Sequence, residues 1–194
     1  MSSMSIPSAS HGHLESVLFE EEVILTRLDE LAVEIAKEYE GKSLTVVAVL
    51  HGSLMMMADL LRRIRLPLKM ECLSVESYHG GVESSGKVSF NMKKMPALSG
   101  DHVLIIDDIL DSGRTLEEIT RRISTECEPE SIRVAVLLDK KADRAAAIKP
   151  DYVGFEIDDL FVVGYGLDYR GRYRNLPFIG TLKSEYLLPE HRSS

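Results

Sequence analysis

The sequence predicts an α/β fold, in which a mainly parallel sheet is flanked by helices and a small hood lies toward the carboxyl end of the chain. Residues 44–50, 103–106 and 132–138 are continuous apolar runs, which are typical of parallel strands covered on both faces. The segments between them carry apolar residues at helical spacing, and such alternation implies right-handed crossovers. With 194 residues, of which 44% are hydrophobic, the chain can bury one sizeable core. We therefore expect a single domain over residues 15–188.

The first half of this pattern reads as helix, strand, turn and helix. Residues 21–39 carry apolar side chains at helical spacing, and Gly41 follows as a stop signal. After the run at 44–50 comes a short turn and then a second helix over residues 54–64. The three consecutive methionines at 55–57 indicate core packing rather than a ligand site.

The remainder of the chain continues the alternation and then departs from it. Residues 68–77 and 87–93 are expected to form two strands, and the Gly- and Ser-rich connection between them, 78–86, is expected to be mobile. A helix at 116–123 follows the second apolar run. Residues 152–180 show short strands and no long helix, so we expect them to form the main part of the hood.

Composition and charge exclude several classes of protein. No segment approaches about eighteen uninterrupted apolar residues, so neither a membrane span nor a membrane partner is expected. Residues 1–14 lack the basic start and apolar run of a secretory signal and are expected to be a disordered tail, as are residues 189–194. Cys72 and Cys127 lack Cys-x-x-Cys spacing, which favours buried free thiols in a reducing cytoplasm. The net charge of −8 argues against a nucleic-acid partner.

The most informative segment is residues 103–115, where an apolar strand runs into two acids, a turn of small and hydroxyl residues, and a helix. The acids are Asp107 and Asp108, and the turn residues are Ser112, Gly113 and Thr115. The first N–H groups of a helix have no intrahelical partner and the helix dipole favours an anion, so a phosphate fits there. The hydroxyls add donors, the glycine permits close approach, and the acids can accept hydrogen bonds from two neighbouring ribose hydroxyls. The segment therefore indicates a sugar-phosphate site.

Other interpretations of this segment fit less well. An ordinary strand, turn and helix would use Asp111 or Ser112 as the helix N-cap, but this does not account for the acid pair. A nucleoside-triphosphate loop needs Gly at position 108 and Lys at position 114. A calcium loop needs an oxygen ligand at position 109. The turn at 50–53 also precedes a helix and is a second candidate anion site, although alone it is weak evidence.

These residues resemble a known family. Residues 103–115 resemble the phosphoribosyl-pyrophosphate (PRPP) signature of type I phosphoribosyltransferases. Residues 155–157, 161–169 and 173–177 resemble the carboxy-terminal region of the hypoxanthine-guanine phosphoribosyltransferases. The resemblance runs from about residue 44 to residue 180. Because the two motifs are separate, their joint presence is more specific than either alone.

The resemblance implies an enzyme of purine salvage. Its reaction is the Mg²⁺-dependent transfer of the 5-phosphoribosyl group from PRPP to N9 of hypoxanthine or guanine, which gives IMP or GMP and pyrophosphate. It also implies a type I phosphoribosyltransferase core and a homodimer or homotetramer. Three alternatives stay open: a xanthine- or adenine-preferring enzyme, and a PRPP-binding regulatory relative without activity.

The resemblance also assigns roles at PRPP. The residues that it places there are Leu50, His51, Gly52, Asp107, Asp108, Asp111, Ser112, Gly113, Arg114 and Thr115. Among them, Asp111 is the general acid/base, and the peptide between Leu50 and His51 is expected to be cis. Ser77 and Tyr78 are transition-state contacts on the mobile loop, and Arg174 binds the pyrophosphate. Mg²⁺ would be held near Asp107 and Asp108, with a second ion at Asp168.

For the base, the resemblance assigns three groups and leaves one choice open. Lys140 donates to the 6-oxo group, Phe161 packs on the ring, and Val162 offers its backbone carbonyl to the far edge. The resemblance also counts Asp168 as a purine-binding residue. A lysine donor prefers a 6-oxo acceptor to the 6-amino group of adenine. Lys141 is the alternative in the neighbouring register.

The chain departs from the common family pattern at three places: Asp107 stands where many relatives have Glu, Arg114 replaces a frequent Lys, and residues 158–160 read Asp-Asp-Leu where Pro-Asp-Lys is common. None of these changes removes a catalytic group. The third alters the rim of the base pocket, so the preference among hypoxanthine, guanine and xanthine stays open.

Overall fold

The computed structural model describes residues 11–76, 89–90, 95–141 and 146–188. Within them, a six-stranded sheet has the order β4-β3-β2-β5-β6-β7, and a three-stranded sheet has the order β1-β9-β8. The helical elements are η1 (His11–His13), α1 (Glu21–Glu38), α2 (Leu54–Leu61), α3 (Arg114–Glu126) and η2 (Ser184–Tyr186). The strands are β1 (Leu14–Phe19), β2 (Leu44–Leu50), β3 (Leu68–Glu76), β4 (Ser89–Phe90), β5 (His102–Leu110), β6 (Ser131–Lys140), β7 (Tyr152–Ile157), β8 (Val162–Val163) and β9 (Ile179–Leu182).

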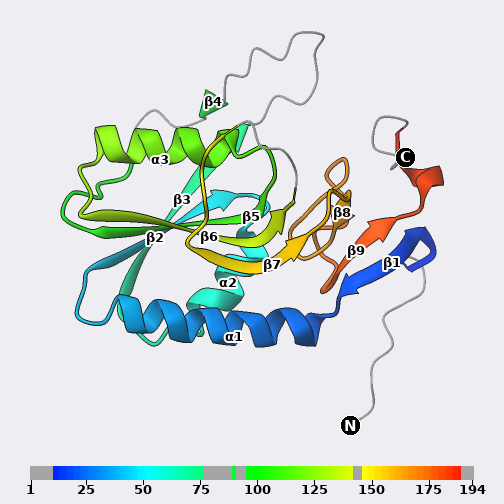
Figure 1. The fold of residues 1–194 in the computed structure, drawn as a ribbon, viewed down its shortest axis with the longest axis horizontal. Helices are drawn as coiled ribbons and strands as arrows, with labels where there is room; N and C mark the ends of the chain where they lie inside the picture. The colour runs from blue at the N-terminus through cyan, green and yellow to red at the C-terminus, as the bar shows by residue number, and fades with distance from the viewer. Residues whose placement is uncertain (1–10, 77–88, 91–94, 142–145, 189–194) are drawn as a thin grey trace.

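The large sheet confirms the predicted α/β class. Its strands β3, β2, β5, β6 and β7 run parallel to one another, and β4 joins the β3 edge antiparallel. Figure 1 shows α1 and α2 on one face of this sheet and α3 on the other. Each face has its own buried cluster, in which the central strands contribute alternate side chains to the two sides. This double cover explains why the strands read as unbroken apolar runs.

Two central strands extend further than their apolar runs. The sequence predicted that Asp107 and Asp108 follow a strand, but β5 continues through both of them to Leu110. Likewise β6 includes Asp139 and Lys140. The reason is that β5 and β6 keep their parallel register through this region, where Leu110 pairs with Asp139. Backbone pairing between the strands does not depend on side-chain polarity, so the two acids belong to the strand rather than to the loop that follows it.

The helices agree closely with the predicted spans. α1 buries Ile24, Leu28, Leu31 and Ile35, which are the residues of its apolar stripe. α2 ends at Leu61, three residues before the predicted end, and Met56 and Met57 are buried in the core as expected. α3 begins at Arg114, directly after the turn of the central motif.

The hood differs from the predicted one in two of the segments that form it. Residues 152–157 form β7 of the large sheet rather than part of the hood. The hood instead takes its outer strand, β1, from the amino-terminal end of the chain, where Leu14 pairs with Leu182 and Phe19 with Ile179. Figure 1 shows β1 beside β9 at the right-hand end of the molecule. The expected tail at 1–14 is therefore wrong for residues 11–14, because Leu14 packs into the hood core; residues 1–10 lie outside the described residues.

In the described part of the chain, no helix is both long enough and apolar enough to cross a membrane. The two cysteines are free, with Cys127 buried, as predicted, and Cys72 half-buried. The burial of Cys127 raises the pKa of its thiol.

A buried carboxylate, Asp101, ties together the amino-terminal ends of three neighbouring strands. It is only 4% exposed and accepts hydrogen bonds of 2.7 Å from the hydroxyls of both Ser43 and Thr45. Lys69 of β3 contributes its ammonium at 3.0 Å. These donors, the Ser43 hydroxyl foremost, lower the pKa of Asp101, although burial opposes them. Asp101 therefore stabilises the fold while it is ionised.

We expect Asp101→Ala to lower the free energy of unfolding at pH 7 by roughly 2–3 kcal/mol, because several donors lose their charged acceptor. A carboxyl whose pKa is lowered by folding stabilises the protein above its unfolded pKa of about 3.9, and this contribution is lost as the pH falls toward the folded pKa. Urea unfolding at pH 7 and at successively lower pH measures the difference between wild type and variant. The difference should shrink below about pH 4; a constant difference would contradict this account.

Candidate active site

A cavity of about 330 Å³ opens at the carboxyl ends of the parallel strands. In open α/β sheets this edge is where ligands gather. Four segments line the cavity: the β2–α2 loop, the end of β5, the β5–α3 loop and the hood loop between β8 and β9. The predicted site residues among its lining are Leu50, His51, Gly52, Asp107, Asp108, Asp111, Ser112, Gly113, Thr115, Asp168 and Arg174. The chain thus brings most of the predicted PRPP residues to one place.

The other predicted residues lie elsewhere. Arg114, Lys140, Phe161 and Val162 are not part of the cavity lining. Ser77 and Tyr78, together with the loop at 78–86, fall outside the described residues. The lining also includes apolar side chains that the sequence did not single out, such as Val49, Val75 and Leu116. They give the cavity an apolar floor beside its acids and backbone groups.

The acid pair lines the cavity, with Asp107 buried and Asp108 half-buried. Asp107 is only 8% exposed, and its Oδ1 accepts the backbone N–H of Asp108 at 3.0 Å. Asp108 accepts the N–H of Ile109 at 3.0 Å. Burial raises the pKa of both carboxyls, and the neighbouring carboxyl raises that of Asp107 further. The pair therefore holds a proton more tightly than exposed acids do, which makes it sensitive to any cation or donor that enters.

Gly52 is the point where the β2–α2 loop meets the acid pair. The Leu50–His51 peptide that precedes it is cis, as expected. A Cβ on Gly52 would lie 1.7 Å from Oδ2 of Asp108. The carbonyl of Gly52 is equally close to the hood, because a Cβ on Gly166 would lie 2.0 Å from it. Only residues without side chains allow these three segments to approach so closely.

The β5–α3 turn presents the amino terminus of α3 to the cavity. Gly113 stands at the helix cap with a left-handed φ of 77°, and no side chain caps the helix by a hydrogen bond. A Cβ there would lie 3.0 Å from Ile148 and 3.1 Å from Ala146. The alternative with Asp111 or Ser112 as N-cap is therefore wrong, and both side chains are exposed at the mouth of the cavity. Because no side chain of the described residues caps α3, its first N–H groups can bind an external acceptor.

The hood contributes an aspartate and an arginine to the opposite wall of the cavity. Asp168 and Arg174 form an ion pair of 2.6 Å. Arg174 also donates to the carbonyl of Gly166 at 2.6 Å, and Asp168 accepts the N–H of Gly171 at 2.7 Å. The Arg174 guanidinium opposes the rise in the pKa of Asp108. The hood thus supplies a positive group near the buried acids.

Lys140 lies beside the cavity and between two carboxylates. Its ammonium is 2.9 Å from Asp159 and 3.8 Å from Asp111, and its side chain is 12% exposed. Lys141 points elsewhere, because it is 60% exposed and pairs with Glu156 at 3.2 Å. The geometry therefore favours Lys140 over Lys141. The sequence noted Asp159 only as part of a departure from the family, and nothing local indicated that it contacts Lys140.

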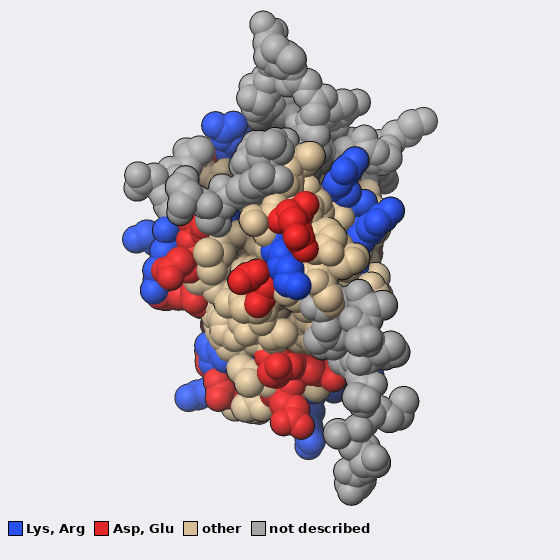
Figure 2. Space-filling view, turned by 90° about the vertical axis from the view of Figure 1, so that its right-hand side faces the viewer, with Lys and Arg blue, Asp and Glu red and all other residues tan. Residues whose placement is uncertain are grey.

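The aromatic and backbone groups predicted for the base lie in the hood. The ring of Phe161 packs edge-on against that of Tyr169 at 5.3 Å between centroids. Val162 is buried and pairs with Thr181 of β9. Figure 2 shows this end of the molecule, where acidic and basic side chains are mixed over the part of the face that is not grey. An anionic ligand must therefore be attracted by local groups such as Arg174 and the α3 amino terminus rather than by a broad basic face here.

Four acids, Asp107, Asp108, Asp111 and Asp168, line the cavity, and carboxylate oxygens are suitable ligands for a hard cation such as Mg²⁺. Among the described residues, however, no group of three or more His, Cys, Asp or Glu side chains is arranged to hold a metal ion without further ligands. Any ion here would need oxygen atoms from a bound substrate or from water.

Comparisons with known proteins agree with this arrangement. The model of the phosphoribosyl transferase domain matches residues 17–170. A hypoxanthine-guanine phosphoribosyltransferase of Staphylococcus aureus is 46% identical over 175 residues, which are 90% of this chain and 97% of that protein. A crystal structure of a hypoxanthine phosphoribosyltransferase from the same species has a TM-score of 0.87 at 45% identity and covers 93% of this chain and 98% of its own.

A third relative is described with a ligand. The structure of a variant hypoxanthine phosphoribosyltransferase from Trypanosoma cruzi, complexed with the product IMP, has a TM-score of 0.82 at 39% identity and covers 89% of this chain and 93% of its own. The fold, the cavity at the carboxyl ends of the strands and these similarities agree. The chain belongs to the phosphoribosyltransferase family.

Proposed function

We propose that the protein transfers the 5-phosphoribosyl group from PRPP to N9 of hypoxanthine or guanine, giving IMP or GMP and pyrophosphate in purine salvage. The observation that carries this proposal is one cavity, which combines the Asp107–Asp108 acid pair, a helix amino terminus, the β2–α2 loop and a guanidinium. The relatives named for hypoxanthine and guanine support the choice of substrate. The cytoplasm is the expected location, and a homodimer or homotetramer is the expected assembly.

PRPP fits the cavity with its three parts in three places. The 5′-phosphate is bound by the amino terminus of α3, with Ser112, Gly113, Arg114 and Thr115 around it. The ribose hydroxyls are bound by the buried Asp107 and the half-buried Asp108. The pyrophosphate lies against the backbone of residues 50–52 and is bound by Arg174, whose planar fork donates hydrogen bonds in pairs.

The acids fit Mg²⁺, which would neutralise charge on the departing pyrophosphate. Asp107 and Asp108 are adjacent carboxyls whose hydrogen bonds come from backbone N–H groups. Mg²⁺ in proteins is commonly held by one or two carboxylates together with substrate phosphates, which matches a site without a complete protein ligand set. Asp168 would hold a second ion from the hood.

Asp111 manages the proton of the base. As the bond between C1′ and the pyrophosphate oxygen breaks, the bond between C1′ and N9 forms, and the base must lose a proton. Asp111 is exposed at the mouth of the cavity, next to the helix that binds the phosphate, so its carboxylate can accept that proton. Lys140 donates to the 6-oxo group, Phe161 packs on the ring, and Val162 offers its carbonyl. Ser77 and Tyr78 are proposed transition-state contacts.

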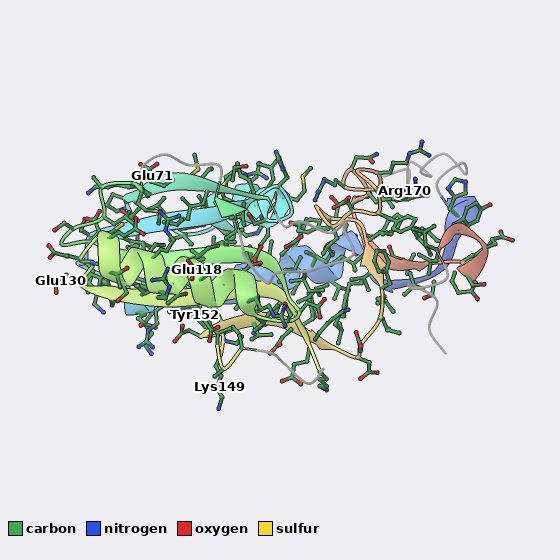
Figure 3. The ribbon with its side chains drawn as sticks, turned by 90° about the horizontal axis from the view of Figure 1, so that it is seen from above. Glu71, Glu118, Glu130, Lys149, Tyr152 and Arg170 are labelled. Atoms are coloured by element: carbon green, nitrogen blue, oxygen red, sulfur yellow. The ribbon has the colours of Figure 1, made fainter. Side chains whose placement is uncertain are left out.

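The first test is nucleotide formation from PRPP and Mg²⁺ with hypoxanthine, guanine, xanthine or adenine, using wild type and Asp111→Ala. We expect turnover of 6-oxopurines, and a fall in kcat of about 100-fold or more in the variant with little change in the KM for PRPP. Glu130→Ala is the matched control, since Glu130 is an exposed acid at the far end of the molecule (Figure 3). PRPP binding without turnover of any base would favour a regulatory protein.

Lys140→Met should lower kcat/KM for hypoxanthine by about 5- to 150-fold, because the 6-oxo group would enter the pocket without its donor. The KM for PRPP should stay near that of wild type, because of the two substrates the donor is proposed to contact only the base. Lys141→Met is the control in the neighbouring register. Equal losses in the two variants would show that the lysine acts through general charge rather than through position.

Gly52→Ala should reduce kcat/KM for PRPP by about 100-fold, because the added methyl group must displace the Asp108 carboxylate. Gly12→Ala serves as the control, since a Cβ on Gly12 meets nothing within 4 Å. Steady-state kinetics and thermal unfolding of both variants separate a local effect from loss of fold. Wild-type kinetics in Gly52→Ala would contradict the close approach of Gly52 to Asp108.

A further inference from the structure

The two walls of the cavity belong to different sheets, so their separation must be set by contacts between the hood and the main domain. One such contact is the approach of Gly166 to the carbonyl of Gly52. Gly166 also holds Arg174, because its carbonyl accepts the Arg174 guanidinium at 2.6 Å. The place of Gly166 therefore decides both where the hood loop lies and where Arg174 lies.

Tyr165, the neighbour of Gly166, reaches from the hood into the main domain. Its backbone has a left-handed φ of 50°, between Gly164 and Gly166 at 99° each. Its N–H donates to Leu176 within the hood at 2.8 Å. The side chain turns away from the hood core, is 4% exposed, and packs in the cluster formed by α1 and α2. Tyr165 is thus a hood residue whose ring belongs to the main core.

The Tyr165 hydroxyl donates to a carboxylate that is itself held by ion pairs. It donates to Oδ2 of Asp59 on α2 at 2.6 Å. The other oxygen of Asp59 pairs with Arg62 and, at 3.8 Å, with Arg63. Arg63 is held in turn by Asp29 of α1 at 2.8 Å. Because α2 begins directly after the Gly52 loop, the helix that holds the hydroxyl also carries the loop against which Gly166 packs.

A comparable hydrogen bond within the main domain provides a matched comparison for Tyr165. Tyr152 on β7 is 6% exposed, and its hydroxyl donates to Glu38 of α1 at 2.5 Å. Burial and the carboxylate acceptor raise the pKa of both phenols, so both are donors at neutral pH. Tyr152 lies at the start of β7 in the main domain, away from the hood that carries Arg170 (Figure 3). The two tyrosines match in burial and bonding and differ in their distance from the cavity.

We propose that Tyr165 is a positioning residue, whose bond to Asp59 sets the approach of the hood loop to Gly52 and so the place of Arg174 at the pyrophosphate end of the cavity. The proposal rests on the proposed function, because it names the substrate group that depends on this spacing. The base groups Phe161 and Val162 are near Tyr165 in the sequence but are held by other contacts, Phe161 by the ring of Tyr169 and Val162 by its pairing with Thr181 of β9. Loss of the bond should therefore affect pyrophosphate and PRPP more than hypoxanthine.

The test compares Tyr165→Phe with Tyr152→Phe in the full chain. For Tyr165→Phe we expect the KM values for PRPP and, in the reverse reaction, for pyrophosphate to rise by about three- to tenfold, as for one lost hydrogen bond. The KM for hypoxanthine should change by less than about twofold. Tyr152→Phe should lower the Tm comparably and leave all three KM values unchanged. Equal kinetics in the two variants, or equal shifts for base and PRPP, would overturn the proposal.

Changes on the helix side keep the test independent of one variant's folding. Asp59→Ala removes the acceptor and should give the same split in KM values, whereas Asp59→Asn keeps an oxygen acceptor and should remain near wild type. In the double variant Tyr165→Phe/Asp59→Ala the rise in KM for pyrophosphate should be no larger than in either single variant, since both single variants already lack the same Tyr165–Asp59 bond. Additive effects would overturn the proposal. Failure of wild type to turn over any purine would refute the proposed function instead, before any variant is compared.

Discussion

The cavity depends on one constraint, the close packing of three backbone segments around Gly52. The acid pair of β5, the loop after β2 and the hood loop at Gly166 meet there at distances that a single methyl group would prevent. Backbone N–H and C=O groups can face a ligand at this junction because no side chain covers them. The acids and the hood guanidinium keep their relative places for the same reason.

The acid pair makes this junction energetically demanding. Two adjacent carboxyls in a buried strand lose much of their hydration, which is why their pKa values rise rather than fall. Asp101, at the amino-terminal ends of the same strands, has hydroxyl and ammonium donors and a smaller opposing effect of burial, and its pKa falls. Asp101 is satisfied by side-chain donors within the protein, whereas we propose that Asp107 and Asp108 are stabilised by what binds. The candidate site therefore lies at the carboxyl ends of the parallel strands, and the stabilising contacts of Asp101 lie at their amino-terminal ends.

Much of the fold and most of the PRPP site could be predicted from local sequence patterns. Unbroken apolar runs identified the strands, because a strand covered on both faces has no polar side. The turn after β5 was recognisable since its small, hydroxyl and acidic residues occur together, and strand order then placed it at the ligand-binding edge. The resemblance to a known family added the hood residues Asp168 and Arg174 and the cis peptide at Leu50, which spacing alone does not indicate.

What could not be predicted depends on contacts between distant segments. β1 was assigned in part to a tail because its partner, β9, lies about 160 residues later, and a short edge strand has no periodicity strong enough to identify it. Tyr165 and Asp59 are separated by 106 residues, so nothing near either residue indicates the bond. The left-handed φ of Tyr165 was equally hidden, because non-glycine residues adopt it only where their surroundings require it. The segments that form the candidate site can therefore be predicted from the sequence. The contacts that set the distances between these segments are seen only in the folded structure.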